Sequence, residues 1–399
     1  MSLKLKNIGE LVTYNSEKKS MVILKDIEIA IENGKISDIG TLVGDCDEIL
    51  DCKKKLITPG YIDSHTHPVF VKSRYNDFFD RLSGLTYKNI QEKGGGIISS
   101  VKDVRKASYK KLIRCVKNRM DRFINMGTTT VECKTGYGLS LESELKSLDV
   151  LDKVNSIHEI DIIATFMGAH AIPPEYTNNR SDYVKIICDD MIPSVKKQGI
   201  AIFNDVFCEE GYFSIEESRK IMLTAKLHGL FNRIHADEFN DFGGGELAAE
   251  THAISADHLM NISEKNIGKM VDNGVIGTLL PGTTFSLGIN NYAPYKKMKE
   301  MGLEIALATD YNPGSCNIKS MSFIISLACI FLGMNPLDAI KAATYTSAKS
   351  LLIDKVTGSI EVGKNSDIVV WDFDSHIKIP FMVTNHPIKH IIKSGKLLN

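Results

Sequence analysis

Two histidines separated by one residue, His65 and His67, are the first side chains in the sequence that suggest a chemical role. On a β-strand, alternate side chains share a face, so we expect the two imidazoles to point the same way. Two neutral imidazoles that converge from the end of a strand make half of a zinc-type site. The alternative is a chance pairing of histidines on a polar turn, and the motif alone does not decide between the two.

Two later residues, His235 and Asp310, supply the other half of such a site. Each comes at the end of a short apolar run. Together with the first pair they give three imidazoles and a hard carboxylate, which leaves one position open for water, as in mononuclear zinc or iron hydrolases. Taken singly, His235 has the alternative of a core histidine and Asp310 that of a helix cap. Their joint occurrence favours one Zn or Fe ion per subunit.

A single ion is also favoured by the end of the fourth apolar run, residues 200–207. This run leads into Cys208-Glu209 and carries no lysine that could be carbamylated to bridge two metals. Lys134, after the second run, is a lesser candidate for such a bridge. Its alternative is an inward-facing lysine paired with Glu132 or Glu209.

A hydrolytic metal site also needs a base that takes a proton from water and passes it to the leaving nitrogen. Glu238, three residues after His235, is our candidate for that base. His258 ends the next apolar run and can steady a developing oxyanion or the attacking hydroxide. The alternative for His258 is a hydrogen-bonding partner of a metal ligand. We expect Asp237 to be structural.

Eight apolar runs alternate with helical stretches between residues 62 and 352, a pattern typical of βα units around a parallel sheet. After the opening run, they are residues 128–133, 160–167, 200–207, 231–234, 253–256, 275–280 and 304–308. Amphipathic helices are predicted at 109–126 and 215–228, with Gly127 and Gly229 as stops. The pattern predicts an α/β fold with a (β/α)8 TIM-type barrel, whose chemistry lies at the carboxyl ends of the strands. Five of the 11 histidines fall at these ends.

Both ends of the chain have the pattern of β-strands. Asn33-Gly34 and Ser394-Gly395 each provide a hairpin turn between alternating or apolar segments. Each end alone offers too few strands for independent stability. We therefore predict one small composite β-sandwich domain, residues 1–61 plus 354–399, beside a metal-dependent hydrolase barrel at 62–353.

The composition excludes several classes of protein. The chain has 48 basic and 49 acidic residues, a formal net charge of -1, which argues against nucleic acid or a membrane surface as a partner. Its eight cysteines include no C-x-x-C pair, which favours reduced thiols in a cytoplasmic protein. The N-terminus lacks the apolar run of a signal peptide. The longest apolar stretch, residues 321–334, is short for a membrane span and predicts a buried helix.

With these residues in view, the chain resembles the amidohydrolase superfamily, and nearly end to end it is similar to the imidazolonepropionase family within it. The motif Pro-Gly-x-x-Asp-x-His-x-His opens the barrel in many such relatives. Five stretches carry the similarity: residues 57–70, 134–139, 166–171, 235–239 and 308–315. The second, third and fifth are the more specific. The resemblance also favours a homodimer.

This resemblance implies an activity, the hydrolysis of 4-imidazolone-5-propanoate to N-formimidoyl-L-glutamate in the third step of histidine degradation. It implies metal ligands at His65, His67, His235 and Asp310, and a water-activating base at Glu238. It implies substrate contacts at Arg74, Tyr137, His170, Glu238, Asn312, Gly314 and Ser315. An arginine fork suits the carboxylate of such a small-molecule substrate. The alternative for Arg74 is a surface arginine paired with Asp77 or Asp80.

The mechanism expected from these residues is attack of a metal-bound hydroxide, deprotonated by Glu238, on the ring carbonyl. His258 or His170 lies near the oxyanion, and the cyclic amide C–N bond breaks as Glu238 or Asp310 returns the proton. The nearest rival is a mononuclear aminohydrolase of the cytosine- or guanine-deaminase type, which would release ammonia. A second rival is a non-catalytic scaffold, which would bind no metal.

Overall fold

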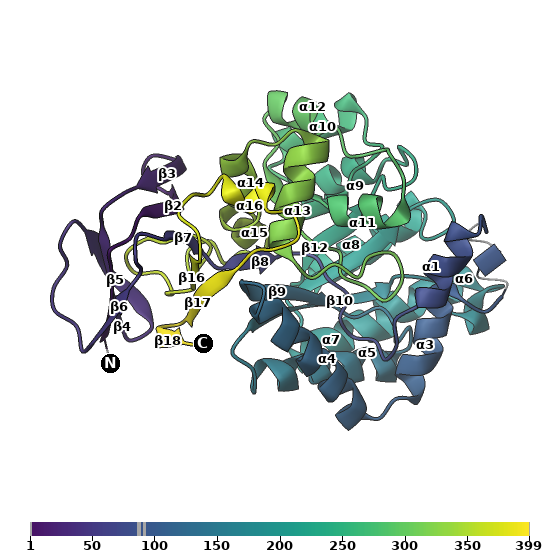
Figure 1. Cartoon of the computed structure of the whole chain (residues 1–399). Coiled ribbons are helices and arrows are strands. Elements are labelled where there is room, and N and C mark those ends of the chain that lie inside the picture. Colours follow the sequence, from purple (N-terminus) through teal and green to yellow (C-terminus); the bar gives the residue numbers. More distant parts are fainter. Residues whose placement is uncertain (1, 86–88, 91–92, 399) are drawn as a thin grey trace.

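Eight parallel strands form the centre of the computed structural model, which describes residues 2–85, 89–90 and 93–398 (Figure 1). Each strand is hydrogen-bonded to the next one along the chain. They are β8 (Tyr61–Asp63), β9 (Thr128–Lys134), β10 (Asp161–Ala169), β11 (Phe203–Cys208), β12 (Phe231–Ala236), β13 (Ser255–His258), β14 (Ile276–Leu279) and β15 (Ile305–Leu307). The predicted α/β barrel is confirmed.

The first and last strands meet through the residues that come directly after them. Asp310 donates its backbone N–H to the carbonyl of His65 at 3.0 Å, and His67 donates to the carbonyl of Tyr311 at 2.8 Å. Asp63, at the end of β8, accepts a hydrogen bond from the backbone of Thr309 at 3.0 Å. These bonds close the sheet into a ring.

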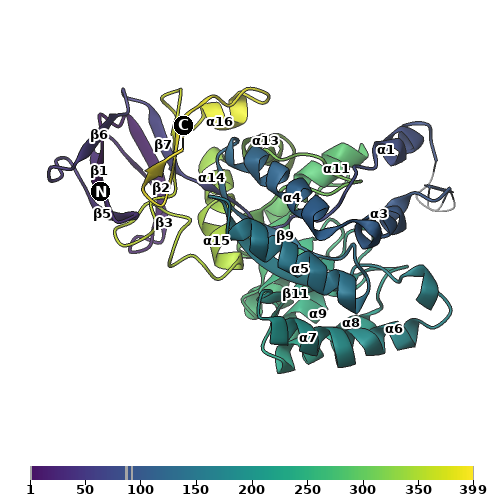
Figure 2. The ribbon, with the colours of Figure 1, turned by 90° about the horizontal axis from the view of Figure 1, so that it is seen from below.

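Helices connect successive strands and surround the ring (Figures 1 and 2). Those between β8 and β11 are α1 (Tyr75–Leu82), α3 (Gly96–Lys106), α4 (Tyr109–Ile124), α5 (Leu141–Asn155), α6 (Arg180–Ile186) and α7 (Ile192–Gln198). Those from β11 to β15 are α8 (Ile215–Leu227), α9 (Gly244–Thr251), α10 (Glu264–Asp272), α11 (Pro281–Leu287) and α12 (Tyr295–Glu300). Further on lie α13 (Met321–Leu327), α14 (Pro336–Ala342), α15 (Tyr345–Ser350) and α16 (Lys378–Phe381).

Local sequence signals set the ends of the predicted helices. Ser214 caps α8 by accepting from the backbone of Glu217, whose side chain accepts from the Ser214 backbone in return. Gly127 and Gly229 come after α4 and α8 with φ of 84° and 74°, a conformation that costs little without a Cβ. Both predicted helices are confirmed, each ending one or two residues earlier than expected.

Two small sheets lie beside the barrel, on the side away from α1 and α3 (Figures 1 and 2). One has the order β5 (Lys35–Gly40), β4 (Glu28–Glu32), β1 (Ser2–Lys6) and β6 (Glu48–Asp51). The other has the order β18 (Lys396–Leu397), β17 (Ile388–Lys393), β16 (Ile368–Trp371), β7 (Leu56–Pro59), β2 (Glu10–Asn15) and β3 (Ser20–Leu24). The second sheet thus joins strands from both ends of the chain. The residue bounds of the two domains stay a prediction.

Side chains such as Leu5, Ile29, Ile57 and Ile368 form one apolar cluster shared by the two small sheets. Their burial stabilises the pairing of strands that are far apart in sequence. Asn33-Gly34 and Ser394-Gly395 form the predicted hairpin turns, with positive φ at all four residues.

The apolar stretch at 321–334 forms α13 and a π-helical turn, Ala328–Leu332. The prediction that this helix is buried was wrong at Ile330 and Phe331, which are 58% and 48% exposed. Leu332, the last residue of the turn, and Met334 are buried again, so the turn exposes one face to solvent and packs the other on the core. Among the described residues, we found no helix with the length and apolar character needed to cross a membrane.

Candidate metal centre and active site

His65 and His67 lie just past the carboxyl end of β8, which stops at Asp63. The prediction that both stand on a strand was wrong in this detail. Thr66, between them, pairs instead with Tyr311 in an isolated bridge. The Thr66 hydroxyl donates to the carbonyl of Glu132 at 2.6 Å, which fixes this segment against β9.

Three imidazole nitrogens and one carboxylate oxygen converge at the end of the barrel. His67 Nε2 lies 3.3 Å from His65 Nε2 and 3.3 Å from His235 Nε2. Asp310 Oδ1 is 3.6 Å from Nε2 of both His65 and His67. All four residues are buried. The chain therefore brings the four predicted ligands together from positions 65 to 310.

Carboxylates behind the ring fix the orientation of two of these imidazoles. Asp257 Oδ2 lies 2.7 Å from His65 Nδ1, and Asp205 Oδ1 lies 3.0 Å from His235 Nδ1. Because a carboxylate accepts, each Nδ1 carries the proton and each Nε2 presents a lone pair. Burial opposes ionisation of Asp205, yet His235 and Lys134 hold the pKa of its carboxyl well below the usual value.

This donor set fits a metal ion. Imidazole–zinc bonds of about 2.1 Å in a tetrahedral site put ligand nitrogens about 3.4 Å apart, close to the spacing found here. The Nε2 lone pair of His65 lies 3.6 Å from a carboxylate oxygen of Asp310, an arrangement that a cation stabilises. Burial also lowers the pKa of His65 and His67 well below the ordinary value, which keeps both rings neutral as ligands must be.

Asp310 is oriented by a neighbouring hydroxyl. Thr283 donates to Asp310 Oδ2 at 2.6 Å, which leaves Oδ1 facing the histidines. Burial raises the pKa of Asp310 to about 6. Asp310 has a φ of 52°, a strained value for a residue with a side chain, as is common at functional sites.

Glu238 and His258 lie next to the four ligands. Glu238 Oε1 is 3.7 Å from His258 Nδ1, and the His258 ring is 5.1 Å from that of His235. Burial, together with the charges of Asp310 and Glu209, raises the pKa of Glu238 well above its usual value. A buried carboxyl whose pKa is raised in this way is suited to carry a proton.

Asp237 caps a helix, as expected for a structural residue. Its carboxylate accepts backbone N–H groups of residues 242–245 at 2.9–3.0 Å, at the start of α9. This fixes the turn that begins directly after Glu238. Asp237 thus holds the loop that carries the candidate base.

One cavity of about 350 Å³ connects the ligands with the predicted substrate contacts. The predicted site residues that line it are His67, Arg74, Tyr137, His170, His235, Glu238, His258, Asp310, Asn312, Gly314 and Ser315. His65 lies behind them and is fully buried. All the predicted site residues therefore belong to this cavity or to its floor.

His170 is held against this cavity by the loop that carries Tyr137. Its Nδ1 donates to the carbonyl of Gly136 at 2.9 Å, and its ring stacks on His67 with centroids 5.0 Å apart. Burial lowers the pKa of His170 to about 3, so the ring is neutral and presents an Nε2 lone pair. Gly136 has a φ of 101°, and a Cβ there would lie 2.9 Å from His170 Nδ1.

Glu144 supports the same loop and was missed by sequence reasoning. Its buried carboxylate accepts the backbone N–H groups of Gly136, Gly138 and Leu139 at 2.8–3.1 Å. The available signal was an acid in the first turn of α5, directly after a glycine-containing loop. Because an acid in the first turn of a helix also interacts favourably with the helix dipole, the sequence alone does not reveal that Glu144 binds the loop backbone.

Arg74 lies in the cavity wall and not on the open surface. Its Nε donates to Asp77 at 3.0 Å and its Nη1 to the Ser100 hydroxyl at 2.8 Å. The predicted alternative of a pair with Asp77 is therefore present, whereas the surface position is not, since the side chain is only 11% exposed. Arg81 lines the same cavity and was not predicted; one of its nitrogens donates to the carbonyl of Gly314 at 3.4 Å.

The loop at 312–315 is held by its own side chains. Asn312 Nδ2 donates to the carbonyl of Asp310 at 2.8 Å and to the Ser315 hydroxyl at 2.7 Å. Asn312 Oδ1 accepts from the backbone of Gly314 and Ser315 at 2.8 Å. Asn312 therefore sets the shape of the loop beside the cavity.

A methyl group at Gly314 is expected to displace the Arg74 guanidinium, because a Cβ there would overlap its Nη2. We expect Gly314→Ala to raise KM about 10-fold and to change kcat little, since the shift affects binding more than proton transfer. Steady-state kinetics measures this effect. Gly44→Ala is the control, because nothing lies within 4 Å of its added methyl. Equal KM values for the two variants would contradict the prediction.

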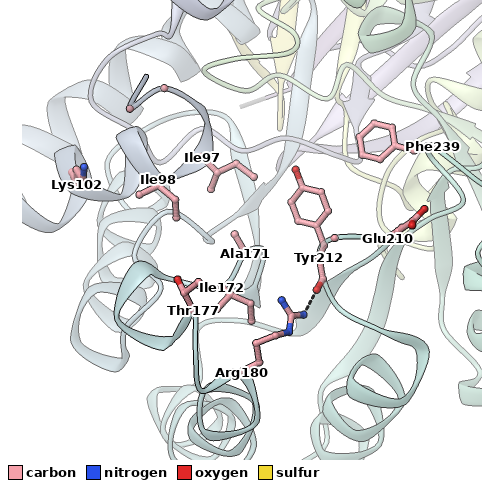
Figure 3. Close-up of a pocket in the computed structure, with 13 residues that line it drawn as sticks. Ile97, Ile98, Lys102, Ala171, Ile172, Thr177, Arg180, Glu210, Tyr212 and Phe239 are labelled. Carbon is pink, nitrogen blue, oxygen red and sulfur yellow. Dashed lines mark hydrogen bonds between the residues drawn. The ribbon is translucent and has the colours of Figure 1, made fainter. Parts of the chain in front are cut away.

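A second hollow of about 690 Å³ adjoins the active-site cavity (Figure 3). The two share Ile97, Tyr212 and Phe239 as wall residues. The Tyr212 ring stacks on Phe207 with centroids 3.9 Å apart, and Arg180 donates to the Tyr212 carbonyl. An apolar and aromatic wall thus lies between the candidate metal centre and a wider hollow.

The fold and this centre define an amidohydrolase. The family model described as "Amidohydrolase family" matches residues 144–398. An atrazine chlorohydrolase of Arthrobacter aurescens in complex with zinc has a similar fold, with a TM-score of 0.73 and 15% identity over 99% of this chain and 95% of that one. An adenosine deaminase of Xanthomonas campestris with bound zinc has a TM-score of 0.72 and 16% identity over 99% and 92%.

Curated relatives identify one family within the amidohydrolases. An imidazolonepropionase of Alkaliphilus oremlandii is 41% identical over 99% of this chain and 97% of its own length. The imidazolonepropionase of Geobacillus kaustophilus is 44% identical over 88% of this chain and 82% of its own length. That of Streptococcus gordonii is 41% identical over 96% of this chain and 93% of its own length. The chain therefore belongs to the imidazolonepropionase family, and the resemblance inferred from its sequence is confirmed.

Proposed function

We propose that this chain hydrolyses 4-imidazolone-5-propanoate to N-formimidoyl-L-glutamate, the third step of histidine degradation. The observation that carries the proposal is one cavity with a metal-type cluster on its floor and Arg74 in its wall. Such a cavity can hold a ring at the cluster and a carboxylate at the arginine. The relatives named imidazolonepropionase, similar over nearly the whole chain, support the same activity.

The residues that would hold one zinc or iron ion per subunit are His65, His67, His235 and Asp310. Three imidazoles and a carboxylate suit either element. When bound, such an ion supplies Lewis acidity and lowers the pKa of water towards neutrality.

The chain's own groups then bind the substrate and move protons. Arg74 binds the propionate, and the neutral His170 accepts a hydrogen bond from a ring N–H. Glu238 takes a proton from the attacking water while the oxygen of that water bonds to the ring carbonyl carbon. The C–N bond of the cyclic amide then breaks, and Glu238 or Asp310 returns the proton to the leaving nitrogen. His258, beside Glu238, steadies the charge on the oxygen.

Four further residues frame this reaction in the proposal. Tyr137 offers its hydroxyl to the substrate from the loop held by Glu144. Asn312, Gly314 and Ser315 shape the opposite wall, where Gly314 leaves room for the arginine. The cavity is lined by other buried and apolar groups, which reduces access of water other than the reacting molecule.

The decisive experiment offers imidazolone propionate, made in situ, and follows the loss of its ultraviolet absorbance. We expect the absorbance to fall with purified protein and no ammonia to be released. An unchanged absorbance in protein loaded with metal would overturn the proposal. Ammonia release from cytosine or guanine would favour the aminohydrolase alternative. A cytoplasmic location and a homodimer stay predictions.

A further inference from the structure

A buried lysine, Lys134, lies beneath the metal centre. It ends β9 and has no solvent exposure. Its Nζ is 2.7 Å from Asp205 Oδ2, 2.8 Å from Glu132 Oε1 and 3.9 Å from Asp257 Oδ2. These three acids are themselves fully buried. One ammonium group thus meets three carboxylates in the interior of the barrel.

Each of these carboxylates forms a hydrogen bond with a different part of the segment or ring that carries a candidate ligand. Asp205 bonds Nδ1 of His235 at 3.0 Å, and Asp257 bonds Nδ1 of His65 at 2.7 Å. Glu132 accepts the backbone N–H of Thr66, the residue between His65 and His67, at 3.1 Å. The backbone N–H of Lys134 also donates to the carbonyl of Thr66 at 2.9 Å.

A second buried cation, Arg233, helps Lys134 to balance the negative charge of these carboxylates. Arg233 donates to Asp257 at 3.3 Å, and its remaining bonds go to the carbonyls of Ser64 and Ser350. Of the two cations, Lys134 is the one that pairs with Asp205 and Glu132. Because a buried carboxylate without a partner is costly, removing Lys134 would force both acids to move or rearrange.

We propose that Lys134 is a positioning residue for the metal centre. Through Asp205, Asp257 and Glu132 it orients His235, His65 and the backbone between the two first histidines. It does not bridge two metals, because its Nζ is engaged by Asp205 and Glu132 below the ligands. This inference rests on the proposed metal centre and adds to it a residue that aligns the candidate histidine ligands through acids on three strands.

The test is the affinity of the Lys134→Met variant for zinc, measured on metal-free protein by competition with a chromophoric chelator. Methionine keeps the length of the side chain and removes its charge. We expect the affinity to fall about 10- to 100-fold, the usual effect of losing a group that orients metal ligands. The absorption spectrum of the cobalt(II)-loaded variant should also change, because it reports ligand geometry.

Lys393→Met is the matched control. Lys393 is also buried and pairs with two acids, Asp367 at 2.9 Å and Asp161 at 2.5 Å, but it lies in β17 of the small sheet. We expect this variant to unfold at a lower temperature and to bind zinc as the wild type does. A Lys134→Met variant that does the same would show a purely structural role and overturn the proposal.

Glu132→Gln provides a second variant in case Lys134→Met does not fold. It weakens the connection from Lys134 to Thr66 and leaves the pair with Asp205 in place. A several-fold loss of zinc affinity is expected, and wild-type affinity in this variant would overturn the proposal. Wild-type protein that binds no zinc would overturn the metal centre itself, whereas wild-type binding with unaltered variants removes only the role of Lys134.

Discussion

Replacing Glu238 with glutamine is expected to lower kcat about 1000-fold, the usual range for loss of a general base. Glutamine has nearly the same shape but cannot take a proton from water. Because Glu238 is not among the four convergent ligands, the metal content per subunit should stay that of the wild type. Single-turnover kinetics and elemental analysis of the same preparation measure the two quantities together.

The control for this variant is Glu10→Gln. Glu10 and Glu238 are buried to a similar degree, 8% and 7% exposed, but Glu10 lies in β2 and bonds His376. We expect Glu10→Gln to keep full kcat and to lose some stability. Full activity in Glu238→Gln would remove Glu238 as the base and leave Asp310 as the remaining candidate for proton transfer.

Replacing Arg74 with methionine is expected to lower kcat/KM about 100-fold, as when one partner of a buried charge pair is lost. Most of this loss should appear in KM, because the propionate is bound equally in the ground state and the transition state. Methionine retains part of the apolar stem, so the cavity wall keeps much of its packing. Steady-state kinetics with the full substrate measures the effect.

A substrate analogue without the propionate provides the internal control. Wild-type protein and Arg74→Met should turn over this analogue equally slowly, since neither forms the ion pair. Arg219→Met serves as the surface control, because Arg219 pairs with Glu250 on the helix surface. An unchanged KM in Arg74→Met would mean that another group, such as Arg81, binds the carboxylate.

The barrel and the convergence of the four candidate ligands were largely predictable because both depend on local patterns. Short apolar runs, helix stops at Gly127 and Gly229, and polar residues at run ends each occupy only a few positions. The barrel topology then brings the run ends to one face, so His235 and Asp310 meet the first histidines. The sequence did not predict that β8 stops before His65, because the closing contacts come from residues 309–311.

The charged network under the site was not predicted, since its members come from four different strands. The sequence alone allows Lys134 to bridge two metals or to pair with Glu132 or Glu209; in the structure it pairs with Glu132, and its second partner is Asp205. A usable signal was available: Asp205, Arg233 and Asp257 are charged residues that lie in, or directly after, runs predicted to be buried strands. Charges in such strands persist when they are paired, but the sequence does not say with which residue.

The closure of the ring links the candidate metal centre to the integrity of the whole barrel. The backbone bonds that join the first and last strands involve His65, His67 and Asp310, the same residues that converge as ligands. A cation held there would act as a cross-link across the joint between the two ends of the barrel and would limit its opening. With a cation bound there, catalysis and resistance to unfolding would be coupled, and a substitution that weakens metal binding would also loosen the barrel at that joint.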